Sequence, residues 1–148
     1  MKKIILALLV LLNISCSTSD DTNDFEPKTI TPVLIGKGDL NGSEGIPQQN
    51  SVITNDIDWK NLKTQIGTYN VSTLKENTIN FNDFQIVVVF DKVYGNGGHS
   101  IDITNVIENS NNIKITIEHL LTGGAAAVIT QPYHIIKIPK STKPIVFQ

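Results

Sequence analysis

The only cysteine of the chain, Cys16, is the residue whose surroundings most clearly predict a chemical reaction. It follows Ile14 and Ser15 directly. An apolar run from Ile4 to Leu12 precedes these residues, and two lysines precede the run. Basic residues, a short apolar run and a small residue form, in that order, a secretory signal. The run is about half of the roughly 20 residues that a membrane-spanning helix needs, so it indicates a cleaved signal.

The residues before Cys16 are similar to the lipobox of a lipoprotein signal peptidase, with Asn13 at a position where leucine is usual. We expect residues 1–15 to be removed and acyl chains such as palmitate to hold Cys16 on a membrane. A single cysteine in an exported chain can form no internal disulfide, and acylation also removes a free thiol. A sixteen-carbon chain contributes on the order of 10 kcal/mol to membrane binding. The alternatives are a signal peptide cleaved elsewhere and a buried structural cysteine.

Residues 16–28 are polar and acidic, which predicts a disordered tether that spans roughly 40 Å when fully extended. Its Ser19-Asp20-Asp21 cluster resembles the acidic export signal of surface lipoproteins in Bacteroidetes, although a plain solvated linker explains it equally well. We therefore expect an outer-membrane lipoprotein of the cell envelope, on either the outer or the periplasmic face.

The composition argues against a nucleic-acid partner. Acidic residues number 14 against 12 basic ones, and every basic residue is a lysine. Arginine is the preferred side chain for bidentate contacts to phosphates and bases, and an acidic chain without arginine lacks the electrostatic attraction for nucleic acid.

Three histidines and one serine are the remaining candidates for chemistry. His99, His119 and His134 lie in or beside predicted strands, but their spacing fits no known metal-ligand pattern. Ser100 follows His99 directly, and neighbouring side chains in a strand point apart. No serine lies in a Gly-x-Ser-x-Gly elbow. We expect no catalytic residue, no metal and no cofactor.

The glycine-rich segment 36–45 is a further candidate for ligand binding. It lacks the spacing of a phosphate loop. Asp39, Asn41 and Ser43 alternate as calcium ligands do, but no glutamate closes the set. We expect this segment to be a flexible hairpin tip between strands at 31–35 and 51–54.

The elements that must position these residues follow from the apolar periodicity. Asn55 can cap a helix in which Trp59 is a core anchor and which Gly67 ends. The continuous apolar run at 84–90 predicts a strand buried on both faces. Apolar residues then alternate at Ile101 and Ile103 and at Ile113, Ile115 and Ile117, which predicts a hairpin whose other face, including Asp102, is polar.

Further strands at 133–138 and 144–147 complete a single domain over residues 29–148. The fold class is α+β and mainly β, an antiparallel sheet or compact β-sandwich of about six strands with one helix covering a face or an end. Two glycine-rich loops, 94–99 and 120–127, stand at strand ends. They are either tight turns or an edge that another backbone approaches closely.

The last part of the chain, about 84–148, resembles the C-terminal domain of the protease-complex subunit PrcB family. The likeness rests on the apolar strand ending at Phe90, the glycine pair Gly97-Gly98 entering a strand, and the segment Gln131 to Lys140. His99 stands where the family usually has an aromatic residue. The resemblance implies a non-enzymatic accessory domain that binds a protein, possibly an exported protease.

A weaker resemblance is to chagasin-type inhibitors of cysteine proteases, in which the counterparts would be the glycine pair and Pro132-Tyr133. A carbohydrate-binding or other ligand-binding envelope module is the third interpretation. The predicted partner-binding residues lie in loops at 95–99 and 123–133: Gly97, Gly98, His99, Gly123, Gly124, Pro132 and Tyr133.

Overall fold

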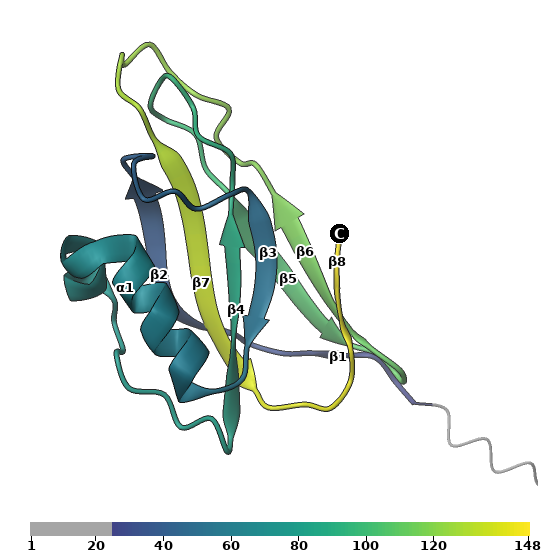
Figure 1. Ribbon diagram of the computed structural model, residues 1–148. Coiled ribbons are helices and arrows are strands. Elements are labelled where there is room, and N and C mark those ends of the chain that lie inside the picture. The colour runs from purple at the N-terminus through teal and green to yellow at the C-terminus, as the bar shows by residue number, and fades with distance from the viewer. Residues whose placement is uncertain (1–24) are drawn as a thin grey trace, which may run out of the picture.

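The computed structural model describes residues 25–148 (Figure 1). Cys16, the predicted cleavage site and most of the predicted tether lie outside the described residues. The elements are β1 (Lys28–Thr29), β2 (Val33–Leu40), β3 (Gln49–Ile53), α1 (Asp56–Thr73), β4 (Phe84–Phe90), β5 (Asp102–Glu108), β6 (Ile113–Glu118), β7 (Gln131–Pro139) and β8 (Ile145–Phe147). Among these residues, no helix has the length and apolar character needed to cross a membrane.

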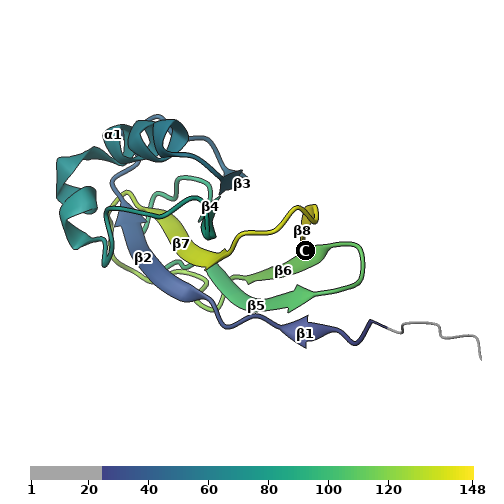
Figure 2. The ribbon, with the colours of Figure 1, turned by 90° about the horizontal axis from the view of Figure 1, so that it is seen from below.

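The strands form two four-stranded sheets, and the helix covers one of them. The central sheet has the order β2-β7-β4-β3 and is antiparallel throughout. The outer sheet has the order β1-β5-β6-β8, and only its β6–β8 pair is parallel. Figure 2 shows the three layers, with α1 on one side of the central sheet and the outer sheet on the other. The predicted fold class, a mainly β sandwich with one helix, is confirmed.

The central pair of strands, β4 and β7, is buried on both faces. Val88 and Ile135 belong to the core under the helix, which also contains Trp59. Val87 and Ile136 belong to the core between the two sheets. This confirms the prediction that the apolar run at 84–90 forms a doubly buried strand.

The helix begins and breaks as its sequence predicts. Asn55 caps it, because its side-chain oxygen accepts a hydrogen bond from the Asp58 amide at 2.9 Å. Trp59 is buried, and its indole nitrogen donates to the Asn77 carbonyl at 3.0 Å. Gly67 adopts φ 81° and ψ 158°, which ends the first helical segment. The chain then resumes a helical course to Thr73, a continuation that the sequence analysis did not predict.

The prediction of a hairpin tip at 36–45 is wrong. Residues up to Leu40 continue β2, and β2 and β3 lie at opposite edges of the central sheet with two strands between them. Gly36 has a packing role, because a Cβ there would lie 2.5 Å from Cδ2 of the buried Leu74 side chain. It leaves room for that side chain against the central sheet.

The predicted hairpin of β5 and β6 is confirmed, with Glu108 opposite Ile113 and the Asn109 amide bonded to the Asn112 carbonyl at 2.8 Å. The expectation that Asp102 lies on a polar outer face is wrong, since this residue is 3 % exposed. A register shift between Ile103 and Asn105 interrupts the alternation just after it.

Candidate functional site

Two long connections leave the same end of the sandwich and pair with each other. Residues 91–101 lead from β4 to β5, and residues 119–130 lead from β6 to β7. The Gly97 amide donates to the Ala126 carbonyl at 3.0 Å, and the Gly124 amide donates to the Gly97 carbonyl at 2.8 Å. The pair, called the double loop below, projects beyond the strands at the top of Figure 1. The structure thus brings together the two glycine-rich loops that the sequence analysis singled out.

The glycines of the double loop permit the two backbones to approach each other. Gly98 has φ 81°, and a Cβ there would lie 3.2 Å from the Gly124 amide nitrogen. Gly123 has φ 103°, and a Cβ there would lie 2.4 Å from Nε2 of His99. The close approach predicted for these residues is therefore made within the chain.

His99 holds the double loop together from inside. Its ring stacks on Tyr94 with centroids 3.6 Å apart, and its Nε2 lies 3.0 Å from the Asn96 side-chain oxygen. Because the Asn96 amide nitrogen donates to the Gly124 carbonyl at 2.9 Å, its oxygen is the acceptor, and His99 Nε2 carries the hydrogen. His99 therefore fixes one loop against the other.

Asp91, at the end of β4, anchors one side of the double loop. Its side chain is 1 % exposed. It accepts hydrogen bonds from the Lys92 amide and the Tyr94 hydroxyl, both at 2.8 Å, and from the Gln48 amide group at 3.1 Å. His119 Nε2 lies 3.0 Å from the same carboxylate. Burial, followed by the hydrogen bond to Asp91, raises the pKa of Tyr94 to about 12, so the phenol stays protonated and donating.

Asp102 anchors the other side. It pairs with Lys37 of β2, accepts the Ser100 hydroxyl hydrogen and lies 3.3 Å from the Leu120 amide. Burial acts to raise the pKa of Asp102, but the hydrogen bonds from Lys37 and Ser100 hold it below its ordinary value. Ser100 also accepts the Leu121 amide hydrogen at 3.0 Å. A carboxylate with a lowered pKa is a weak base, so this arrangement orders the loop and does not activate Ser100.

The three histidines occupy separate places. His99 lies in the double loop and His119 beside Asp91, whereas His134 lies between the sheets, where Nδ1 accepts the Ile103 amide hydrogen at 3.0 Å. Within residues 25–148, no three His, Cys, Asp or Glu side chains gather as a metal site. Burial, followed by the charge of Lys37, lowers the pKa of His134 to about 4, so it is neutral at physiological pH.

Pro132 and Tyr133 are not in a loop. Both lie in β7 and are buried, with the Tyr133 ring in the core under the helix. They contribute only to the wall of a cleft of about 310 Å³ at the base of the double loop. A partner could reach them through this cleft alone.

The sequence analysis missed the apolar surface of the double loop. The side chains of Val93, Leu120, Leu121, Val128 and Ile129 are between 47 % and 62 % exposed. Val93 and Ile129 are neighbours, because a Cβ at Gly42 would lie 2.8 and 3.0 Å from their methyl groups. The indication of this surface in the sequence is that no charged residue occurs from Leu120 to Tyr133. The name apolar tip is used below for these five residues, which extend from Leu120 and Leu121 at the base of the double loop to Val128 beside Gly97.

None of the protein-family models, curated proteins and solved structures compared with this chain matches it. The fold and the site define a small helix-covered β-sandwich that presents two braced loops at one end. The role of the double loop is therefore inferred from its own contacts.

Replacing Gly123 by alanine should loosen the double loop. Alanine at positive φ costs roughly 1–2 kcal/mol, and its methyl group would meet the His99 ring. We expect hydrogen exchange at the Gly124 amide to accelerate roughly tenfold. Gly95→Ala is the matched control, since nothing lies within 4 Å of a Cβ there. Equal protection in the two variants would contradict the assignment of Gly123 to a required close contact.

His134 should make the stability of the protein depend on pH. Its pKa is about 4 in the folded state against an ordinary 6.5. The unfolded chain binds more protons between these values, so the free energy of unfolding falls as the pH drops from 6.5 to 4, by about 3 kcal/mol in all. The His134→Gln variant keeps an acceptor for the Ile103 amide and should lose this slope in urea titrations. An unchanged slope would exclude His134 as its source.

Proposed function

We propose that the double loop is a docking surface for a protein partner, and that the chain is a cell-envelope lipoprotein that holds this surface away from a membrane. The observation that carries the proposal is the apolar tip. Five large aliphatic side chains are exposed on or beside the two loops. Exposed apolar surface concentrated on one pair of loops is characteristic of interaction sites.

The rigidity of the double loop supports binding. Asp91 and Asp102 are nearly inaccessible to solvent, and each takes hydrogen bonds or an ion pair from both connections. Backbone hydrogen bonds join the two loops farther out. A surface ordered before binding loses less conformational entropy when the partner arrives, which increases its affinity.

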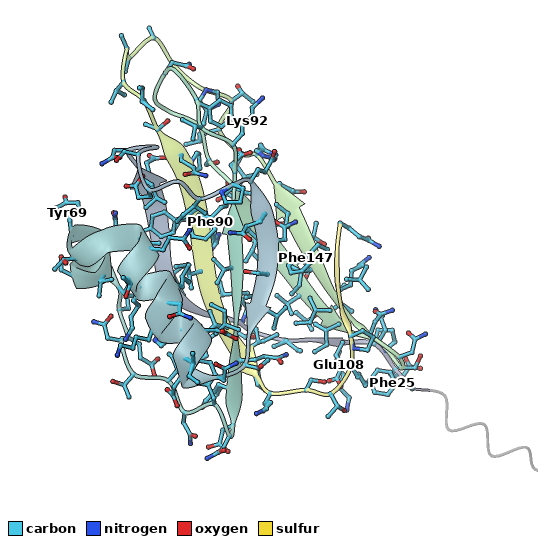
Figure 3. The ribbon with its side chains drawn as sticks, in the orientation of Figure 1. Phe25, Tyr69, Phe90, Lys92, Glu108 and Phe147 are labelled. Atoms are coloured by element: carbon cyan, nitrogen blue, oxygen red, sulfur yellow. The ribbon has the colours of Figure 1, made fainter. Side chains whose placement is uncertain are left out.

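The position of the double loop supports the proposed orientation. The described chain begins at Phe25, whose ring lies 4.0 Å from the Lys143 ammonium group. In Figure 3, Phe25 and Lys92 lie at opposite ends of the molecule, and Lys92 is at the base of the double loop. An acyl anchor at Cys16 would then attach the domain at the end opposite the double loop.

The charges favour a protein over a lipid surface as the partner. Segments that bind anionic membranes combine apolar residues with several lysines or arginines. Lys92 is the only lysine of the double loop, which contains no arginine. An exported protease, as the PrcB resemblance implies, is compatible with this surface. The chagasin-type alternative is less favoured, because Pro132 and Tyr133 are buried in β7 and cannot form an inhibitory loop.

Replacing Leu120 and Ile129 together by serine should abolish partner capture. The two side chains are 62 % and 57 % exposed, so the fold should keep its stability. Loss of apolar contacts at the centre of an interface typically weakens binding about tenfold or more. The measurement is crosslinked pull-down from membranes, quantified on the same captured band. Ile57→Ser, on the exposed face of α1, is the matched control and should capture normally. Undiminished capture by the Leu120 and Ile129 variant would refute the docking surface.

Replacing Cys16 by serine tests the anchor. The variant should leave the membrane fraction, because no acyl chain can be attached, while its folded domain keeps the thermal stability of the original protein. Fractionation followed by detection with an antibody measures the distribution. A variant that stays in the membrane fraction would show that Cys16 is not the attachment point.

A further inference from the structure

The cleft at the base of the double loop has an opening of its own beside the apolar tip. Its volume is about 310 Å³, at the small end of ligand sites, which fits one long side chain better than a large cofactor. Asp39 of β2 and His99 and Leu121 of the double loop contribute to its lining. Leu121 belongs to the apolar tip as well, so a partner on the tip would also cover the cleft.

Most polar groups of the cleft already have partners. Lys37 pairs with Asp102, and the Ser100 hydroxyl both donates to Asp102 and accepts from Leu121. His99 uses Nε2 to bond Asn96. Lys37 and Asp102 cancel each other's charge, so they add no net charge to the cleft.

Asp39 is different. Among residues 25–148, no donor lies within hydrogen-bonding distance of its carboxylate, and it takes part in no ion pair. Asp39 is exposed to solvent at the edge of the cleft. Partial desolvation there raises its pKa, and the nearby His99 opposes that effect only in part. At neutral pH the cleft therefore carries one uncompensated negative charge, which a cationic ligand would neutralise.

Part of the wall of the cleft is apolar. Leu121, Pro132 and Ile101 line it together with the polar groups. An apolar wall leading to a single carboxylate matches an aliphatic stem that ends in a cation. The lysine side chain has this form, with a four-carbon stem and a compact ammonium group.

We propose that the cleft receives a lysine side chain of the partner, with its ammonium group at the Asp39 carboxylate and its stem along Leu121 and Pro132. This inference rests on the proposed function, since it names the chemistry of the partner at the edge of the apolar tip. The ion pair of Lys37 with Asp102 keeps the chain's own ammonium group from occupying the same place. The partner surface is then an apolar patch with a lysine at its border.

The first test uses Nα-acetyl-lysine-methylamide as the probe, titrated into the ¹⁵N-labelled full chain in non-ionic detergent. We expect amide shifts at Asp39 and Leu121 that need probe concentrations above the millimolar range, because one solvent-accessible ion pair contributes only about 0.2–1 kcal/mol. The norleucine analogue, which lacks the ammonium group, should bind about two- to fivefold more weakly. Equal shifts with both probes would overturn the proposal.

Asp39→Asn should weaken binding of the lysine probe by about two- to fivefold, because it removes the charge and keeps the size. Asp56→Asn, an exposed carboxylate without a side-chain hydrogen bond at the start of α1, is the matched control and should bind the probe as the original protein does. Unchanged binding by Asp39→Asn would overturn the cleft assignment.

Partner capture separates this proposal from the docking surface. If Asp39→Asn captures the partner normally and the lysine probe does not bind, the cleft proposal fails and the docking surface stands. If the Leu120 and Ile129 serine variant still captures the partner while the probe binds at Asp39, the docking surface fails and the cleft stands as a lysine site.

Discussion

The pairing of β4 with β7 is the constraint on which the rest of the structure depends. Both strands carry apolar side chains on both faces, and residues such as Val87 and Ile136 lie opposite each other across the pair. A strand buried on both faces needs a layer on each side. The helix, through Trp59, supplies one layer, and the outer sheet supplies the other. Two separate cores therefore share one pair of strands, and the chain must cross between the sheets at the ends of that pair.

Those crossings explain why the double loop is ordered without a core of its own. Where β4 ends and β5 begins, the chain buries two carboxylates, Asp91 and Asp102, and a buried charge is tolerated only with partners. The donors come from both connections, including Tyr94 and the Leu120 amide. Satisfying the carboxylates thus fixes the backbone of both loops. The aliphatic side chains beyond them are not needed for the core and remain exposed, as Val128 shows.

Local sequence patterns predicted the helix and most of the strands. The predictions failed where the role of a residue depends on contacts with distant residues. The apolar run at 84–90, the Asn55 cap and the hairpin all follow from neighbouring residues. Gly36 was assigned to a turn because its packing role in the strand depends on Leu74, far along the chain. Asp102 was assigned to a polar face because alternation cannot reveal a partner such as Lys37 in another sheet. The same limitation hid the apolar tip, which forms only when two separate loops come together.

The apolar tip and the cleft share Leu121, so a partner bound at the tip would also contact the cleft. A partner that covers Leu121 also excludes water from Asp39, because both residues line the same cleft. Burying a carboxylate without a cation costs free energy, and an acidic partner would add repulsion. In the proposed complex, apolar contact at the tip would favour many partners about equally, whereas Asp39 would disfavour partners that bring no positive charge to the cleft. Discrimination of this kind comes from the cost imposed on wrong partners. On this argument the tip supplies affinity and the single carboxylate beside it supplies specificity.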